Sequence, residues 1–445
     1  MAARPFEGRS LHFIGIGGAG MSGLALVAGS LGALVTGSDR AESSYWRPLR
    51  AVGIEPVLGH DAANVPAGAE VVVSTAIPDD NPELSAARAA GTAILHRGDL
   101  LGELSRMKRT IAVGGTHGKT TTASMAALAL LECGREPAFL IGGELRATGT
   151  NAAWGAGEWA VIEADESDRS FLKLAREVAV VTSVELDHHA TYRSVGALEE
   201  AFEEFTEPAA LRVLGPELER FGDGRASVSY GIEAGDLRAR DLRLHRGGSR
   251  FSVEGVEVDL HVPGAHNVLN ALAALASCRA AGLEPSEAGP ALAAFTGAGR
   301  RFEEHGRTPE GALVYDDYAH HPTEVRATLE AARTLEPGRL VACFQPHLYS
   351  RTRMLARGFG RALALADVVV VLDVYPARER TEDFPGVSGL LVAAAAADAA
   401  GGRPVWWLPR MDDAARMLRS ELREGDLLLT LGAGDVDALA KELVG

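Results

Sequence analysis

The chain has 445 residues and a formal net charge of −16, with 47% hydrophobic and 23% charged residues. This length predicts two or three domains with their own cores, and the acidic balance argues against a nucleic-acid backbone as the main ligand. The three cysteines, Cys133, Cys278 and Cys343, are far apart and lack metal-ligand spacing, which indicates a reducing compartment.

The stretch from residue 10 to residue 38 carries no charged side chain and could be mistaken for a signal peptide or a membrane helix. Eight glycines interrupt it with turn signals. We therefore expect no membrane segment and a cytoplasmic protein.

A nucleotide-binding pattern occupies this same stretch. An apolar run at residues 11–16 leads into G-x-G-x-x-G at positions 15, 17 and 20, then a helical stretch (21–31) and a second strand (33–36). Asp39 follows, placed for a ribose hydroxyl. The turn recognises a diphosphate, so NAD, FAD and a nucleotide-diphosphate sugar all fit. Further apolar strands at 71–74 and 93–95 predict a small doubly wound domain that extends to about Met107.

The segment 111–124 reads I-A-V-G-G-T-H-G-K-T-T-T-A-S, an apolar strand end, a glycine turn and the start of a helix (123–131). Backbone N–H groups of such a turn, together with the helix N-terminus, hold a triphosphate. Lys119 would reach the terminal phosphates, and a threonine hydroxyl would ligate Mg²⁺. Val113 stands where the usual motif has its first glycine, so a glycine turn with a surface lysine is the alternative.

Acidic and histidine clusters follow the next two predicted strands. The strand at 159–162 ends in E-A-D-E-S-D (163–168), and the strand at 178–184 ends in E-L-D-H-H (185–189). Each cluster alone fits a solvated turn or a structural histidine. Because both follow a phosphate loop, we favour a shared Mg²⁺ site at the carboxyl edge of one sheet.

Residues 225–261 alternate in polarity and predict a β appendage, after which a long helix begins near His266. Asn267 and Asn270 share one face of this helix, where they cap it or contact a base. Arg300 and Arg301 close this second domain. The remaining chain returns to α/β alternation, with strands at 313–315, 340–344, 368–374 and 426–431, a helix at 323–335, and polar clusters again at strand ends.

These residues alone leave three hypotheses open. The first is a ligase with a nucleotide-type site in the first domain and ATP–Mg²⁺ in the second. The second is an NAD-dependent dehydrogenase whose Gly-Lys-Thr loop holds another phosphate. The third is a regulatory ATPase without ligation chemistry, which the charged clusters in all three domains disfavour.

The chain resembles the Mur ligases, ATP-dependent enzymes that form amide bonds in bacterial cell-wall synthesis. The match runs almost end to end, and the shortened phosphate loop is the form that this family uses. The motifs that carry the resemblance are G-I-G-G-A-G-M-S (15–22), G-S-D (37–39), G-T-H-G-K-T-T (115–121), E-A-D-E-S-D (163–168), D-H (187–188), H-N-x-x-N (266–270), G-R-R-F (299–302), D-D-Y-A-H-H-P-T-E (316–324), F-Q-P-H (344–347) and D-V-Y-P-A-R-E (373–379).

The resemblance implies an α/β fold of three domains. They are an N-terminal Rossmann-like UDP-sugar-binding domain (1–107), a central P-loop-type ATP-binding domain with a β appendage (108–302), and a C-terminal Rossmann-like domain (303–445) that closes over ATP and the amino acid. The implied reaction joins L-alanine to the lactyl carboxylate of UDP-N-acetylmuramate through an acyl phosphate, with release of ADP and phosphate, in peptidoglycan precursor synthesis. The implied partners are small molecules, without nucleic acid or membrane insertion, and the implied state is a monomer or weak dimer.

The nearest competitor is the related ligase that recycles a cell-wall tripeptide onto the same UDP-sugar. Ser167, where that relative usually has tyrosine, and the G-I-G-G-A-G-M-S form favour L-alanine.

The resemblance also implies roles for individual residues. The catalytic residues would be Lys119, Glu163, His188 and His320, and the Mg²⁺ ligands Thr120, Glu163 and His188. ATP would be bound by Gly115, Thr116, His117, Gly118, Lys119, Thr120, Thr121, Asn267, Arg301 and Asp317. The UDP-sugar would be bound by Gly15, Gly17, Gly18, Gly20, Met21, Ser22, Ser38 and Asp39. The acceptor or the muramoyl carboxylate would be approached by His320, His347 and Arg351.

Two positions depart from the family pattern. Many members carry a carbamylated lysine downstream of the Asp-His pair, but this chain has no lysine between Lys173 and Lys441, so we expect none. Relatives often have arginine after F-Q-P-H, where this chain has Leu348.

Overall fold

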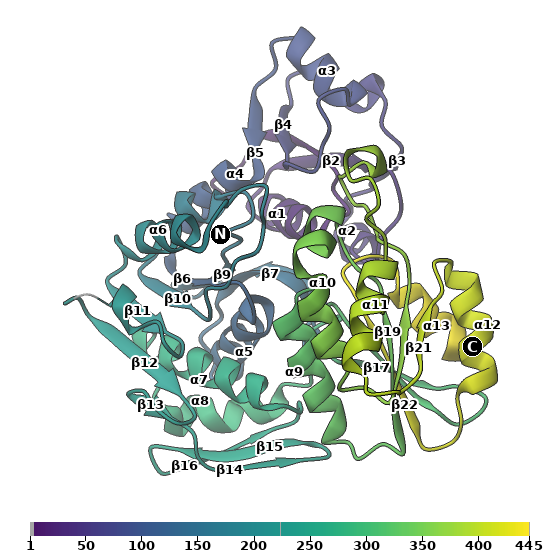
Figure 1. The fold of residues 1–445 in the computed structure, drawn as a ribbon. Coiled ribbons are helices and arrows are strands. Elements are labelled where there is room, and N and C mark those ends of the chain that lie inside the picture. Colours follow the sequence, from purple (N-terminus) through teal and green to yellow (C-terminus); the bar gives the residue numbers. More distant parts are fainter. Residues whose placement is uncertain (1–3, 223, 445) are drawn as a thin grey trace.

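The computed structural model describes residues 4–222 and 224–444, which fold into three α/β segments in chain order (Figure 1). We refer to residues 4–107 as the first segment, to 108–222 and 224–302 as the second, and to 303–444 as the third. The first segment lies at the top of Figure 1, the second at the lower left and the third on the right. No helix among the described residues is long and apolar enough to cross a membrane.

The first segment is a parallel sheet of five strands in the order β3-β2-β1-β4-β5. The order reverses between β1 and β4, which is where doubly wound folds bind ligands. The glycine turn follows β1 at this point. The strands are β1 (Ser10–Ile14), β2 (Leu34–Asp39), β3 (Val57–Leu58), β4 (Glu70–Val73) and β5 (Ile94–His96), and the helices are α1 (Ala19–Ser30), α2 (Trp46–Ala51), α3 (Pro82–Ala89) and α4 (Arg97–Ser105).

The second segment is built on an eight-stranded sheet in the order β13-β12-β11-β10-β6-β9-β7-β8, parallel except for the β7–β8 pair. A separate antiparallel sheet follows, formed by β14, β15 and β16. The elements are β6 (Arg109–Gly114), α5 (Lys119–Glu132), β7 (Ala138–Leu145), β8 (Thr150–Trp154), β9 (Trp159–Glu163), β10 (Val178–Val181), α6 (Val195–Thr206), β11 (Leu211–Leu214), β12 (Ser227–Gly231), β13 (Leu237–Arg238), β14 (Arg240–His245), β15 (Gly248–Val253), β16 (Val256–Leu260), α7 (Ala265–Ala280) and α8 (Pro285–Ala291).

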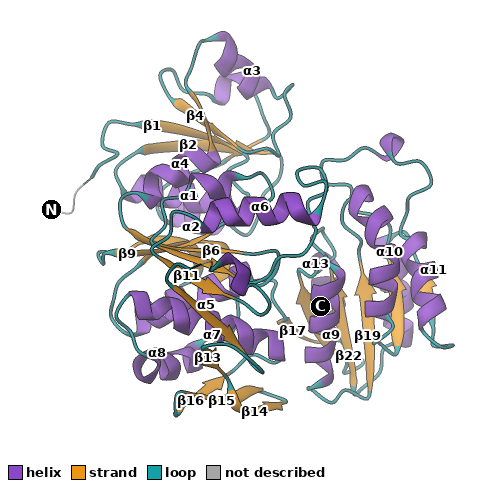
Figure 2. Ribbon diagram, turned by 60° about the vertical axis from the view of Figure 1, so that its left-hand side comes forward, coloured by secondary structure: helices purple, strands orange, loops and turns teal. Residues whose placement is uncertain are grey.

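The position of strand β6 in the sheet explains why its residues 111–113 are apolar. Alternate side chains of a strand point to opposite faces, and here both faces are covered (Figure 2). Ile111 and Val113 pack into a core with α5 and α7, whereas Ala112 packs into a second core on the other face. Helices α5 and α7 pack against strands of the sheet, against each other and against α8, which explains why their alanine-rich sequences are buried.

The second core is shared by the first two segments. Leu24 of α1 and Leu104 of α4 belong to the same hydrophobic cluster as Ile162 of β9 and Phe202 of α6. Helix α1 packs directly on β7 and β8 of the second segment. The first segment is therefore fixed to the second by apolar packing.

The third segment is a six-stranded sheet in the order β17-β18-β22-β19-β20-β21, antiparallel only between β17 and β18. Helices α9, α10 and α11 cover one face, and α12 and α13 cover the other. The elements are β17 (Glu303–Arg307), β18 (Leu313–Asp317), α9 (Pro322–Arg333), β19 (Arg339–Phe344), α10 (Tyr349–Leu363), β20 (Val368–Val371), α11 (Leu390–Ala399), β21 (Val405–Trp407), α12 (Met411–Glu421), β22 (Asp426–Leu431) and α13 (Asp437–Val444).

The α/β fold class predicted from the sequence is confirmed, with several differences in detail, such as strand β20, which ends at Val371 rather than at residue 374. Residues 225–261 are not one appendage, because β12 and β13 extend the eight-stranded sheet and only β14–β16 stand apart. Strand β10 ends at Val181 rather than at residue 184. Beyond that point Thr182 bonds to the phosphate loop. Its N–H donates to the Gly114 carbonyl at 3.0 Å, and its hydroxyl donates to the His117 carbonyl.

Candidate active site

A cavity of about 1040 Å³ lies where the three segments meet. The glycine turn after β1, the phosphate loop after β6, and the carboxyl ends of β9, β18 and β19 all reach it. This placement is the one that parallel sheets favour for ligands. Among the predicted site residues, those that line it are Gly17, Gly18, Thr116, Gly118, Lys119, Thr120, Glu163, His188, Arg301, His320, His347 and Arg351.

The phosphate loop has the backbone that a triphosphate site needs. Gly118 is the N-cap of α5 and adopts φ 78°, a left-handed conformation. A Cβ there would also lie 2.5 Å from Oδ1 of Asn270, so only glycine fits. The N-terminus of α5 consequently faces the cavity with its unpaired N–H groups.

Lys119 is held inside the loop by backbone and carboxylate oxygens. Its Nζ donates to the Gly115 carbonyl at 2.7 Å and lies 2.9 Å from Oε2 of Glu166. Burial alone would lower the pKa of Lys119, but the charges of Glu166, Asp165 and Glu163 outweigh it and raise that pKa. The lysine is therefore a permanent cation at neutral pH.

The three candidate Mg²⁺ ligands line this one cavity. Nη2 of Arg301 donates to the Thr120 hydroxyl at 3.4 Å, and the Gly142 N–H donates to Glu163 Oε2 at 2.7 Å. Nε2 of His188 lies 3.4 Å from Glu166 Oε1. The hydroxyl and the carboxylate are oxygen donors of the kind that Mg²⁺ prefers, with phosphate oxygens and water to complete its shell, and the imidazole of His188 is a softer third donor.

The four carboxylates of residues 163–168, which follow β9, make contacts of two kinds. Arg97, at the start of α4 in the first segment, pairs with Asp165 at 2.7 Å and with Asp168 at 2.9 Å. Burial would raise the pKa of Asp165, but Arg97 and Lys119 hold it well below its usual range. Two of the four carboxylates thus fix the first segment to the second, and Glu163 and Glu166 remain at the phosphate loop.

A smaller pocket of about 180 Å³ adjoins the loop and contains His117, Gly118, Thr121, Asn267, Arg301 and Asp317 of the predicted ATP set. Asn270 donates to Oδ1 of Asn267 at 3.2 Å and accepts from the Thr122 hydroxyl at 3.2 Å. The two asparagines therefore lie on one helix face, as expected, and join α7 to α5.

Asp317 connects the third segment to this pocket. Its carboxylate accepts the N–H of Phe302 at 2.7 Å and that of Ala319 at 2.8 Å. Burial raises its pKa to about 6, although Arg301 and the two N–H groups act against that shift.

The third segment contributes two partly buried histidines and a buried arginine. Burial lowers the pKa of His320 to about 4 and that of His347 to about 3, so both are neutral at pH 7. Arg351 forms a two-pronged ion pair with Asp187 of the second segment, at 3.0 and 2.9 Å, and both side chains are about 95% buried or more. Nη1 of Arg351 also lies 3.0 Å from Nδ1 of His347.

The glycine turn of the first segment is closed by Asp39, whose Oδ2 accepts the Gly17 N–H at 2.9 Å. Gly15 has φ 80°, and Gly20 lines a neighbouring cavity of about 240 Å³. Met21, Ser22 and Ser38 are buried away from the main cavity. The Ser38 hydroxyl donates to Glu83 at 2.5 Å, which ties β2 to α3.

Contacts between segments are the functional features that the sequence does not show. Arg97 was not identified from the sequence. Individual roles were also not assigned to Glu166, Glu185, Asp187 and Glu324, although all four lie in clusters or motifs that the sequence pointed to. Glu324 at the start of α9 lines both cavities and lies 3.2 Å from Nδ1 of His117. Burial would lower the pKa of His117, but Glu185 and Glu324 raise it to about 9.

Three family models match the chain in order. They are the Mur ligase family catalytic domain (residues 10–109), the Mur ligase middle domain (113–278) and the Mur ligase glutamate ligase domain (300–434). A curated relative from Streptomyces coelicolor, UDP-N-acetylmuramate–L-alanine ligase, is 46% identical over 451 residues, which cover 97% of this chain and 96% of that protein. The chain belongs to the Mur ligase family.

Other Mur ligases agree with this assignment. The UDP-N-acetylmuramate–L-alanine ligase of Acidithiobacillus ferrooxidans is 44% identical over 462 residues, covering 98% of this chain and 97% of that one. The solved structure of UDP-N-acetylmuramate–alanine ligase MurC from Thermotoga maritima has a TM-score of 0.84 at 32% identity, covering 98% of both chains. A murein peptide ligase from Psychrobacter arcticus has a TM-score of 0.75 at 25% identity over the same share. Mur ligases are ATP-dependent, and this chain is an enzyme of that class.

Proposed function

We propose that the chain joins L-alanine to the lactyl carboxylate of UDP-N-acetylmuramate, at the expense of ATP, in peptidoglycan precursor synthesis. The observation that carries the proposal is the identity of 44–46%, over nearly the full length, to relatives named UDP-N-acetylmuramate–L-alanine ligase. The single cavity shared by the three segments gives the reactants one place to meet.

The reaction has two steps. An oxygen of the lactyl carboxylate attacks the γ-phosphorus of ATP, the bond to the β-phosphate oxygen breaks, and an acyl phosphate and ADP form. L-alanine, bound as an ammonium, first loses one proton to solvent. Its neutral amine then attacks the acyl carbon, the bond from that carbon to the phosphate oxygen breaks, and the proton that the nitrogen gives up passes to the departing phosphate. In the first step two anions approach each other, and Lys119 stabilises the charge on the phosphate through its fixed positive charge.

Mg²⁺ would be held by Thr120, Glu163 and His188, whose donor atoms line the cavity beside Lys119. When bound, it supplies further positive charge next to the phosphates. Gly115, Thr116, His117, Gly118 and Thr121 would surround the phosphates from the loop. Asn267, Arg301 and Asp317 would contact the rest of the nucleotide.

His320 is suited to orient the incoming amine. Nδ1 of His320 lies 2.9 Å from the Tyr318 carbonyl, and a proton on Nδ1 leaves Nε2 as an acceptor. Since burial keeps the ring neutral, Nε2 accepts a hydrogen bond from the ammonium group of L-alanine. His347 and Arg351 would then receive a carboxylate, with Arg351 already oriented by Asp187.

The UDP-sugar would lie against the first segment. Gly15, Gly17, Gly18 and Gly20 would form the turn that lets the backbone approach its diphosphate, with Asp39 at the ribose, and the buried Met21, Ser22 and Ser38 would act by shaping this turn. The proposal also includes domain boundaries at 107/108 and 302/303, a cytoplasmic protein that is a monomer or weak dimer, and no binding to nucleic acid or insertion into membranes.

The test is release of phosphate from ATP and Mg²⁺ in the presence of UDP-N-acetylmuramate, with L-alanine, glycine, L-serine or the cell-wall tripeptide each added separately. Release that requires both the UDP-sugar and L-alanine is expected. Release with the tripeptide alone would identify a recycling ligase and refute the proposed acceptor.

A further inference from the structure

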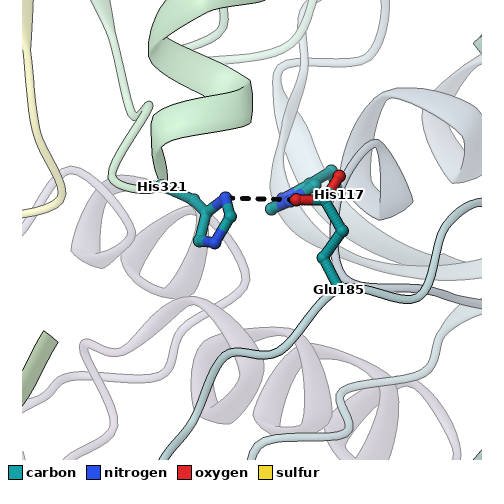
Figure 3. A group of neighbouring side chains, drawn as sticks. All are labelled: His117, Glu185 and His321. Carbon is teal, nitrogen blue, oxygen red and sulfur yellow. Dashed lines mark ion pairs between the residues drawn. The ribbon is translucent and has the colours of Figure 1, made fainter. Parts of the chain in front are cut away.

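Two imidazoles and a carboxylate meet where the second and third segments touch, apart from the Thr120–Glu163–His188 site. His117 comes from the phosphate loop, Glu185 from the chain after β10, and His321 from the N-cap of α9 (Figure 3). One nitrogen of each ring and one oxygen of Glu185 lie within 4.8 Å of one another. No other group of three histidine, cysteine or acidic side chains among the described residues meets this condition. We propose that these three side chains bind a transition-metal ion of the Zn²⁺ type.

The distances suit a small tetrahedral ion. Metal–ligand bonds of about 2.0–2.2 Å place neighbouring tetrahedral ligands about 3.3–3.6 Å apart. Oε2 of Glu185 lies 3.6 Å from Nε2 of His117 and 3.7 Å from Nδ1 of His321. Both distances from Glu185 are thus close to the tetrahedral spacing, and the two ring nitrogens, which lie within 4.8 Å of each other, complete the triangle. Metal binding also replaces a weak capping contact, in which the Thr323 N–H approaches His321 Nδ1 at 3.4 Å.

Two of the three side chains, His117 and Glu185, have the supporting partners that metal ligands in proteins usually have. A metal-binding histidine generally presents its second nitrogen to a carboxylate or carbonyl. Here Nδ1 of His117 faces Oε1 of Glu324 at 3.2 Å, while Nε2 faces Glu185. Glu324 is itself fixed by the N–H of His320 at 2.9 Å. Glu185 is fixed by the Thr323 hydroxyl at 2.6 Å.

The donor types decide which ion is preferred. Two imidazole nitrogens and one carboxylate oxygen favour Zn²⁺ and its neighbours over Mg²⁺, which prefers an all-oxygen shell. The pocket of about 180 Å³ beside His117 and Glu185 has room for a water molecule as fourth ligand. Because the ligands come from two segments, the bound ion joins the phosphate loop to α9.

The experiment titrates the full-length protein with Co²⁺ in excess Mg²⁺, without nucleotide or UDP-sugar, and records the visible d–d bands. Tetrahedral Co²⁺ absorbs far more strongly than octahedral Co²⁺, so wild type is expected to give intense bands that saturate at one ion per chain and disappear on adding Zn²⁺. Neither ligase activity nor ATP enters this readout. A failure of the proposed reaction would therefore leave the result unaffected.

Three variants and a control locate the ion. His321→Asn keeps a good N-cap for α9, and Glu185→Gln keeps an acceptor for Thr323; each is expected to abolish the bands. Glu324→Gln, which removes the carboxylate facing Nδ1 of His117 but keeps a side-chain oxygen to accept the His320 N–H, is expected to weaken binding about 10–100-fold. His245→Asn, at an exposed histidine of β14, should bind like wild type. Absence of intense bands in wild type would overturn the proposal, as would their persistence in both His321→Asn and Glu185→Gln.

Discussion

The ion pair between Asp187 and Arg351 is expected to contribute strongly to the attachment of the third segment. Two unit charges about 4 Å apart attract each other by about 4 kcal/mol at an effective dielectric constant of about 20. Here the nitrogen–oxygen distances are 2.9 and 3.0 Å, and both side chains are almost fully buried. Removal of one partner leaves the other charge buried and unpaired, which typically costs about 3–5 kcal/mol. We expect a loss of this size in the free energy of unfolding for either Asp187→Asn or Arg351→Gln.

The assay is a double-mutant cycle by urea denaturation at neutral pH. The double variant carries no buried charge, so it should lose clearly less stability than the sum of the single variants. The exposed pair of Arg250 and Asp259, at 2.8 Å, is the matched control, and Asp259→Asn should cost below about 1 kcal/mol. Additive losses for Asp187→Asn and Arg351→Gln would refute the reasoning, because they would show that the two charges do not interact.

Three further predictions concern the nucleotide site. Lys119→Ala should reduce phosphate release by about 10²–10³-fold or more, while calorimetry should show UDP-sugar binding close to wild type; loss of both would mean that the two sites are not separate. Gly118→Ala should abolish ATP binding in an equilibrium assay, because its Cβ would lie 2.5 Å from Asn270, whereas Gly134→Ala, with φ 69° and open space around it, should lose only stability. Asp317 has a folded-state pKa of about 6, above the unfolded value of about 3.9, so it lowers stability as pH rises from 4 to 6. In Asp317→Asn this part of the pH dependence should be missing from denaturation curves, and an unchanged slope would count against the raised pKa.

The fold was largely predictable because its strands are short apolar runs between clear breaks. Residues 426–431 were expected as a strand, and β22 spans those residues. The two-residue strands β3 and β13 were not foreseen, since so few residues carry no periodic signal. The same limit explains why residues 225–261 were expected to form one unit.

The residues of the candidate site were predictable only where a single stretch of the chain contains a complete motif. The phosphate loop is such a stretch, and the acidic run after β9 is another. The partners of that run could not be foreseen, because Arg97 is about seventy residues away in the sequence and only folding places it 2.7 Å from Asp165. Asp187 and Arg351 are separated even further, by 164 positions.

The hydrophobic core shared by the first two segments also determines which parts of the enzyme can move. A substrate held by the glycine turn stays at a constant distance from the phosphate loop, since α1 and the second sheet form a single body. The third segment has hydrophobic cores of its own and meets this body at the site through charged and polar pairs. Such pairs can exchange their partners for water, whereas a dry apolar interface cannot separate without exposing its surface. A swing of the third segment alone can thus open the shared cavity, while the glycine turn and the phosphate loop keep their arrangement for the next cycle.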